Sequence, residues 1–118
     1  MKIVYASRTG NVSTFVDKLG ESNVMEIQTG NETVNEKFVL VTYTDGYGEV
    51  PQEVDTFLAN NNAYLVGVAA SGDQSYGDAY CLAADVVSEM YAVPVLAKFE
   101  FDGTMEDVTN FLEALNKL

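Results

Sequence analysis

The sequence predicts an α/β fold in which a parallel sheet is covered by helices on both faces. Two observations predict this class. Short β-branched and apolar segments alternate along the chain with segments of helical periodicity. The strands expected near the middle of the chain are almost continuously apolar, as is typical of parallel strands buried on both faces. With 118 residues, the chain is expected to form one domain over residues 1–118.

Five strands are expected, each bounded by turn-forming residues. They cover residues 2–6, 23–27, 38–42, 65–70 and 93–101. Five parallel strands separated by helices fit the order 2-1-3-4-5, a doubly wound arrangement. In that order the first and third strands border the point where ligands bind, beyond the carboxyl ends of the strands.

Four helices are expected between and after these strands. They cover residues 12–19, 51–60, 79–91 and 105–118, and the first and last carry apolar side chains at helical spacing. The connection over residues 28–37 is polar, and it is shorter than the dozen or more residues of a usual parallel crossover. We expect it to cross as an irregular segment, so the sheet lacks a helix after its second strand.

Composition excludes several classes of function. The chain has no histidine, which removes His-centred acid–base triads and imidazole metal sites, and no metal is expected. Its single cysteine, Cys81, excludes an intrachain disulfide and is expected to be a small buried residue. Six scattered basic residues and a net charge of −12 exclude nucleic acid and anionic membranes as partners. The acidity serves either solubility or docking to a basic partner, and composition alone does not choose.

The sequence is not expected to carry a membrane or secretion signal. No apolar run approaches the roughly 20 residues that span a bilayer. The N-terminus is strand-like and lacks the apolar region and cleavage site of a signal peptide. We therefore expect a soluble, cytoplasmic protein.

The loop after the first strand has the chemistry of a phosphate site. Ser7, Thr9 and Asn11 surround Gly10 directly before a helix, and the only arginine, Arg8, lies among them. Hydroxyl groups, backbone N–H groups and the positive end of a helix dipole together favour a phosphate monoester. The alternative is that these residues are ordinary helix N-caps, which stabilise a helix by about 1 kcal/mol.

The next two loops at the same sheet edge are rich in tyrosine and glycine. Four of the seven tyrosines lie in or beside them, and two of these are adjacent to glycines. A tyrosine beside a glycine in a loop is free to place its ring on a flat ligand, and glycine allows the backbone to approach closely. A planar phosphorylated cofactor fits all three loops, and FMN is the natural candidate. The alternative is exposed loop tyrosines without a ligand. The four tyrosines are Tyr43, Tyr47, Tyr76 and Tyr80.

Three segments carry a resemblance to a known family. Residues 7–11, SRTGN, resemble the flavodoxin phosphate loop in its short S-x-T-G-N form. Residues 42–51, TYTDGYGEVP, resemble the corresponding loop of the NrdI family, small flavodoxin-like activators of class Ib ribonucleotide reductase. Residues 70–78, ASGDQSYGD, are similar to that family's A-S-G-N-x-N-[aromatic]-G-D segment, with Asp73 and Ser75 at its usual asparagines. The resemblance implies a minimal flavodoxin-like three-layer sandwich without the second helix.

The resemblance also implies a redox function. FMN is reduced, reacts with dioxygen and releases superoxide or peroxide, which passes to the dimanganese small subunit of the reductase and forms its tyrosyl radical. A separate flavin reductant supplies the electrons, so the protein is an activating redox partner rather than a stand-alone enzyme. The chemistry is carried by FMN, so no catalytic side chain is expected.

Residues are assigned to this site from all three loops. Gly46 is expected near flavin N5, where its peptide can reorient on reduction. Tyr47, Glu49, Gln74 and Ser75 are expected around the exposed flavin edge, where the reductase subunit docks. The expected cofactor-binding residues are Ser7, Arg8, Thr9, Gly10, Asn11, Val12, Thr42, Tyr43, Thr44, Asp45, Gly46, Tyr47, Gly48, Ser71, Gly72, Tyr76 and Gly77.

Three other functions fit parts of the pattern. A general electron-transfer flavodoxin would bind FMN in the same way without producing an oxidant. A receiver domain of a response regulator shares the strand order, but its carboxylate cluster after the first strand is missing here, and Lys98 alone resembles one of its parts. A cofactor-free interaction domain leaves the loop tyrosines unexplained.

Overall fold

The computed structural model describes residues 1–118 and contains one sheet of five parallel strands. Its order is β2-β1-β3-β4-β5, and every neighbouring pair is parallel, so the predicted order is confirmed. β3 lies in the middle between β1 and β4, and β2 and β5 form the two edges. The strands are β1 (Lys2–Tyr5), β2 (Val24–Glu26), β3 (Phe38–Tyr43), β4 (Leu65–Gly72) and β5 (Val95–Glu100).

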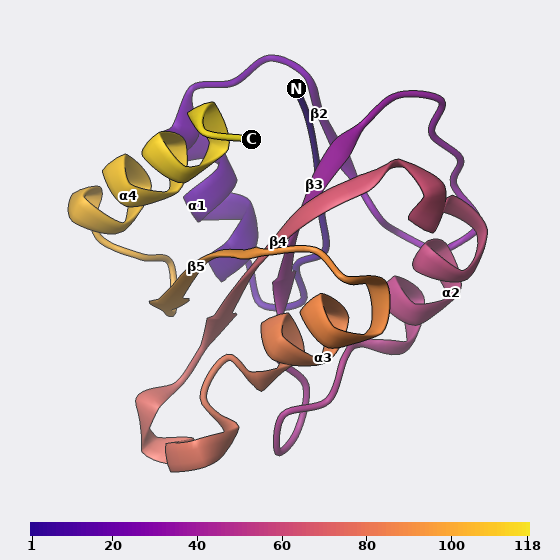
Figure 1. Ribbon diagram of the computed structural model, residues 1–118. Helices are drawn as coiled ribbons and strands as arrows, with labels where there is room; N and C mark the ends of the chain where they lie inside the picture. Colours follow the sequence, from indigo (N-terminus) through magenta and orange to yellow (C-terminus); the bar gives the residue numbers. More distant parts are fainter.

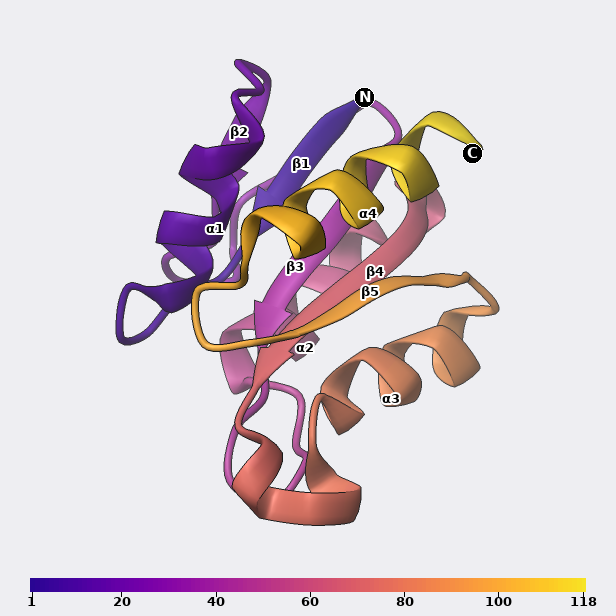
Figure 2. The same ribbon diagram turned by 90° about the vertical axis from the view of Figure 1, so that its left-hand side faces the viewer.

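Four α-helices cover the two faces of this sheet, which confirms the predicted flavodoxin-like three-layer class (Figures 1 and 2). α1 and α4 pack on one face, and α2 and α3 pack on the other. No helix has the length and apolar character needed to cross a bilayer. The helices are α1 (Asn11–Leu19), α2 (Gln52–Asn61), α3 (Leu82–Tyr91) and α4 (Met105–Asn116), with the short 3-10 helices η1 (Asn62–Tyr64) and η2 (Gln74–Ala79).

Two apolar clusters form the core because successive residues of a strand face opposite sides of the sheet. On β3, Val39 and Val41 face α1 and α4, whereas Leu40 faces α2 and α3. Phe15 of α1 stacks on Phe99 of β5, with ring centroids 3.8 Å apart. This contact fixes the middle of α1 against the edge strand β5, on the same face of the sheet.

The connection between β2 and β3 crosses without a helix, as the sequence predicts. The Glu32 carboxylate organises it by accepting hydrogen bonds from the N–H groups of Gln28, Thr29 and Gly30, at 2.8–3.0 Å. The buried Asn61 side chain of α2 donates to Glu32 O and accepts from Val34 N–H, each at 3.0 Å. These side chains satisfy the backbone groups that a helix would otherwise pair.

Several boundaries differ from the prediction by one to three residues, among them three at the carboxyl edge of the sheet. α3 begins at Leu82 rather than at residue 79, because η2 occupies the preceding segment and Cys81 has a φ of +53°. β4 extends to Gly72, two residues further than predicted. β5 ends at Glu100, because Phe101 also has a φ of +53° and leaves the strand. Cys81 is fully buried, and burial raises the pKa of its thiol to about 11.

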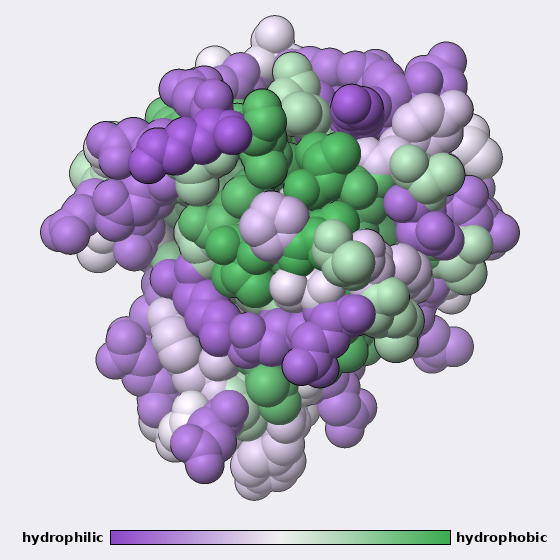
Figure 3. Space-filling model, in the orientation of Figure 1, coloured by the Kyte–Doolittle hydropathy of each residue, from purple (hydrophilic) through white to green (hydrophobic).

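The edge strand β5 lies only partly covered between α3 and α4. In the orientation of Figure 1, apolar side chains gather in the middle of this face and hydrophilic ones surround them (Figure 3). Val95, Leu96 and Ala97 are half-buried there. The register against β4 shifts at this point, and Lys98 follows, two features that oppose pairing with a further strand.

Candidate functional site

A pocket of about 160 Å³ lies at the carboxyl edge of the sheet. The loops after β1, β3, β4 and β5 all contribute to it, at the edge where doubly wound sheets bind ligands. Its lining residues are Ser7, Arg8, Thr9, Asn11, Val12, Tyr43, Thr44, Gly46, Ser71, Gly72, Asp73, Tyr76, Ala79 and Phe101.

The loop after β1 presents free hydrogen-bond donors to this pocket. The N-cap of α1 is Gly10, with a φ of +95°, and no side chain caps it. Ser7 Oγ accepts from Ser13 N–H at 3.2 Å, whereas the N–H groups of residues 9–12 donate to no protein acceptor. The N-cap alternative therefore accounts only for part of the role of Ser7, and Thr9 and Asn11 are left without a capping function.

Arg8 connects this loop to the loop after β3. Its Nη1 lies 3.0 Å from Asp45 Oδ1, and its guanidinium lies 5.0 Å from the centroid of the Tyr43 ring. The ion pair is largely exposed and so contributes little to stability. The cation nevertheless stays beside the pocket, where it lowers the electrostatic cost of an anion.

Tyr43 forms part of the pocket wall and is held by its hydroxyl group. This hydroxyl donates to Glu53 Oε2 of α2 at 2.7 Å. Burial and the Glu53 carboxylate raise the pKa of Tyr43 above its ordinary value of 10.0. The ring therefore stays neutral and fixed while Arg8 rests on its face.

In the turn after β3, hydrogen bonds hold the backbone on both sides of one peptide that makes no hydrogen bond itself. Asp45 and Glu49 pair through backbone hydrogen bonds of 2.7 and 2.8 Å, and Gly46 N–H donates to Asp45 Oδ1 at 3.0 Å. Between these bonds, the Gly46 carbonyl and the Tyr47 N–H make no hydrogen bond within the protein. The peptide that joins Gly46 to Tyr47 can therefore rotate without breaking a hydrogen bond within the protein.

The loop after β4 brings a second tyrosine to the mouth of the pocket. The rings of Tyr76 and Tyr47 meet edge to face with centroids 5.5 Å apart, and their exposed fractions are 48% and 80%. Asp73 accepts from Ser75 N–H and Oγ at 2.9 and 2.7 Å, and these hydrogen bonds lower the pKa of the Asp73 carboxyl. Asp73 lines the pocket, so its carboxylate places a negative charge on this wall.

The structure brings most of the predicted site residues together. Eleven of them line the pocket. Thr42 lies below it, fully buried, with its hydroxyl donating to Tyr43 O. Gly48 packs on Leu82, where a Cβ would lie 2.6 Å from Cδ2, so this position cannot carry a side chain without movement. Outside the lining are Gly10, Thr42, Asp45, Tyr47, Gly48 and Gly77.

Sequence reasoning missed three lining residues: Asp73, Ala79 and Phe101. Asp73 and Ala79 belong to the loop after β4, from which the sequence predicts only Ser71, Gly72, Tyr76 and Gly77 as site residues. Phe101 follows β5, and the loop after β5 is not one of the three predicted loops of the site. Phe101 could have been found from the sequence as an aromatic residue at the end of the strand next to β4. Neighbouring parallel strands end at the same edge of a sheet, so the residue after β5 lies near the site.

The donor set fits a phosphorylated organic cofactor. Four unpaired backbone N–H groups, three small polar side chains and one arginine converge where a phosphate would be bound. The remaining walls combine aromatic rings with backbone, as a planar ligand requires. No group of three or more cysteine, aspartate or glutamate side chains is arranged to hold a metal ion.

The fold and this pocket define a flavodoxin-like protein. Among solved structures, a short-chain flavodoxin associated with a non-canonical PDU bacterial microcompartment is 24% identical, with a TM-score of 0.75, covering 98% of this chain and 95% of that one. A Streptococcus pneumoniae TIGR4 flavodoxin is 26% identical, with a TM-score of 0.72, covering 99% and 95% of the two chains.

The sequence then identifies the family within this class. Residues 3–113 match the family described as NrdI flavodoxin-like. Protein NrdI of Bacillus licheniformis is 44% identical over 118 residues, which are 100% of this chain and 89% of the relative. The chain belongs to the NrdI flavodoxin-like family, and the predicted family is confirmed.

Proposed function

We propose that this protein binds FMN in the pocket and activates class Ib ribonucleotide reductase. The observation that carries the proposal is the set of unpaired N–H groups over residues 9–12, in a pocket walled by tyrosines, on a chain of the NrdI family. The chemistry that bound, reduced FMN supplies is electron transfer to dioxygen: one electron gives superoxide, and two electrons with two protons give hydrogen peroxide.

The phosphate of FMN is assigned to the loop after β1. The N–H groups of residues 9–12 and the side chains of Ser7, Thr9 and Asn11 donate to it, and Arg8 supplies positive charge. The flat ring is assigned to the space between the loops after β3 and β4. Tyr76 lies there beside Gly46, and Tyr43 closes the inner side.

The peptide between Gly46 and Tyr47 is assigned to proton control at the flavin. Its carbonyl is free of protein donors, so it is available to accept a hydrogen bond from a protonated ring nitrogen. The flanking hydrogen bonds of Asp45 hold the turn while this one peptide rotates. Gly46 has a φ of +47°, a conformation that glycine adopts without steric cost.

The oxidant is proposed to pass to the dimanganese small subunit of the reductase, docked over the mouth of the pocket. A short-lived product must leave near the ring, so the docking contacts are assigned to Tyr47, Glu49, Gln74 and Ser75, which are exposed on the loops after β3 and β4 that also line the pocket. A separate flavin reductant supplies the electrons. The protein's own part is to hold FMN, to exclude bulk water from its inner side and to present the exit to the partner.

Binding of the phosphate is tested by titrating the apoprotein with FMN and with riboflavin. The fluorescence of FMN should be quenched on binding. Riboflavin, which lacks the phosphate, should bind far more weakly. Asn11→Ala should reduce the difference between the two ligands, whereas Asn116→Ala, at the end of α4, should leave it unchanged. Equal affinities for FMN and riboflavin would remove the phosphate assignment.

Activation is tested by mixing the photoreduced protein with manganese-loaded class Ib small subunit and dioxygen. The tyrosyl radical should appear in the electron paramagnetic resonance spectrum only when all three are present. A general electron-transfer flavodoxin would bind FMN but give no radical. That result would contradict activation and leave FMN binding intact.

A further inference from the structure

Phe101 reaches the pocket from β5 in a conformation that is costly for its side chain. Its φ is +53°, in the left-handed region that bulky residues rarely occupy. A glycine at this position would avoid the cost, as glycines do at most other positive-φ positions of this chain. Residues held in such conformations persist where the surrounding structure fixes them, and they concentrate at ligand sites.

The end of β4 fixes the backbone of Phe101 on both sides of the residue. Ser71 Oγ donates to Phe101 O at 2.5 Å, and Phe101 N–H donates to Gly72 O at 3.0 Å. Ser71 is almost fully buried, and its own carbonyl accepts from Thr44 Oγ1 at 3.0 Å. The Ser71 hydroxyl is therefore directed at Phe101, and Ser71 joins the loops after β3 and β5.

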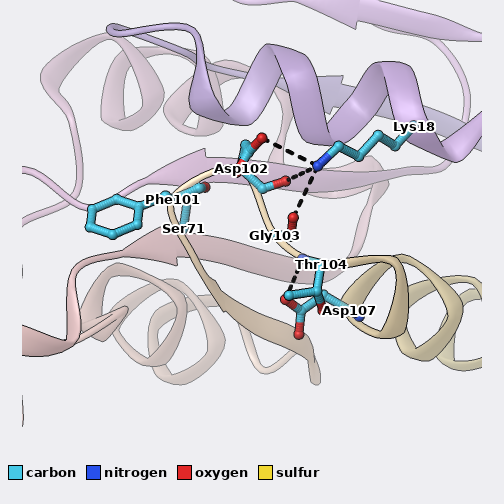
Figure 4. A network of polar contacts seen from close by, with 7 residues as sticks. All are labelled: Lys18, Ser71, Phe101, Asp102, Gly103, Thr104 and Asp107. Atoms are coloured by element: carbon cyan, nitrogen blue, oxygen red, sulfur yellow. Dashed lines mark hydrogen bonds and ion pairs between the residues drawn. The ribbon is translucent and has the colours of Figure 1, made fainter.

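The residues after Phe101 are held by α1 and by the start of α4. Figure 4 shows the Lys18 ammonium reaching this turn, while the Phe101 ring points away from it. Lys18 Nζ donates to Asp102 O at 3.2 Å and to Gly103 O at 2.9 Å. Thr104 and Asp107 then form a reciprocal capping box that begins α4. Hydrogen bonds thus hold the backbone of this turn along its length. The Phe101 ring is the exposed apolar group of the turn, with an exposed fraction of 48%.

We propose that Phe101 is an aromatic wall of the cofactor pocket that raises its affinity for FMN, and that Ser71 is a positioning residue that acts through Phe101. The inference rests on the proposed FMN function and extends it to a fourth loop. Phe101 lines the same pocket as Asn11 and Val12 of the phosphate loop and as Tyr76. The hydrogen bonds of Ser71, Gly72 and Lys18 hold the backbone at this positive φ, and the ring then closes the pocket on the β5 side.

The first test is Phe101→Gly, which removes the ring and the strain together. The Kd for FMN should rise roughly three- to tenfold, the range for one aromatic contact. The thermal midpoint of the apoprotein should hold or rise, because the relief of strain offsets the lost contacts. Phe101→Asn, which also tolerates the left-handed region, should give the same pair of results.

Ala92→Gly is the matched control. Ala92 has a φ of +56° at the C-terminus of α3, away from the pocket. Its replacement should raise the thermal midpoint and leave the FMN Kd unchanged. This control separates relief of strain from loss of a cofactor contact.

The second test is a double-mutant cycle with Ser71→Ala. In the wild-type background this change should raise the FMN Kd roughly threefold or more, the size of one lost hydrogen bond. In the Phe101→Gly background it should change the Kd less than about twofold, because residues in one network are not additive. Equal effects in both backgrounds would show that Ser71 acts without Phe101.

The outcomes separate the inference from the function on which it rests. A wild-type protein that binds no FMN would remove the proposed function itself. A wild-type protein that binds FMN, together with Phe101→Gly of unchanged Kd, would overturn the role of Phe101 and leave FMN binding in place. If Phe101→Gly leaves the Kd for FMN unchanged but slows docking to the reductase subunit, the Phe101 ring belongs to the surface that contacts the partner instead.

Discussion

At the scale of single residues, Tyr76 is the side chain best placed to cover a flat ligand. It lines the pocket, and its ring contacts only Tyr47 among the other aromatic residues. We predict that Tyr76→Ala raises the Kd for FMN roughly three- to tenfold and restores flavin fluorescence, because a stacked aromatic ring quenches it. Fluorescence titration measures both effects. Tyr64→Ala in η1 is the control, and unchanged emission in the Tyr76 variant would count against stacking.

Gly46 allows a cleaner test than the neighbouring Gly48. A Cβ at Gly46 would meet nothing closer than Glu49 Oε1 at 3.8 Å, so Gly46→Ala changes backbone preference without a clash. We predict a shift of tens of millivolts in the flavin midpoint potentials, since the left-handed conformation costs alanine about 1 kcal/mol. Gly20→Ala, with a φ of +70° and open space around it, is the control. Identical potentials in both variants would show that the Gly46 turn is static.

At the scale of elements, the helix-free connection between β2 and β3 depends on one carboxylate. Burial raises the pKa of Glu32, but backbone hydrogen bonds, among them those from Gln28, Thr29 and Gly30, outweigh burial and lower the pKa from 4.5 to about 2. A lowered folded-state pKa stabilises the fold above the unfolded value, and this stability is lost as pH falls from about 4.5 towards 2. Because the loop is exposed to solvent, this contribution of Glu32 to the stability is small.

We predict that Glu32→Gln lowers the free energy of unfolding by about 1 kcal/mol at pH 7. The difference from wild type should shrink below pH 4.5 and vanish near pH 2, the range over which Glu32 itself is protonated. Urea unfolding followed by circular dichroism at several pH values measures it. Glu36→Gln, which removes a carboxylate from the same connection and leaves these N–H groups untouched, is the control for the change in net charge. A difference that is constant across pH would assign the effect to packing.

The elements could be predicted from the sequence because their apolar periodicity is strong and local. Val12, Phe15, Val16 and Leu19 are buried on α1 as their spacing predicts, and so is the run from Phe38 to Val41. The start of α3 could not be predicted in this way, because Cys81 leaves the helical conformation to bury its side chain beneath β4. The same limit applies to Phe101, whose conformation is set by Ser71 and Gly72, thirty and twenty-nine residues earlier in the chain.

Part of the candidate site could be predicted because some of its residues are close together in the sequence, in a single loop. Ser7, Thr9 and Asn11 lie together because one helix start brings them together. The link from Arg8 to Asp45 could not be derived, since it joins loops that meet only after the sheet has formed. Local chemistry thus identified the donors, and tertiary structure decided which of them are paired.

At the scale of the whole molecule, the charge is strongly unbalanced and mostly unpaired. Eighteen acidic residues face six basic ones, and three ion pairs form: Arg8–Asp45, Lys18–Asp102 and Lys98–Asp85. Most carboxylates therefore contribute to a negative field around the protein. Such a field steers oppositely charged partners and weakens as salt is added, because the Debye length falls to about 8 Å at physiological ionic strength.

We predict that association with the reductase small subunit is electrostatically steered and slows by about tenfold or more between low and high salt. Stopped-flow mixing across a salt series measures the association rate. Glu49→Gln, beside the pocket, should slow association more than Glu113→Gln, an exposed position near the end of α4. A flat salt response would mean that the charge serves solubility and that docking rests on apolar contacts such as Tyr47. Radical formation that survives a bulky block at Ser75 and Glu49 would move the docking surface elsewhere on the molecule.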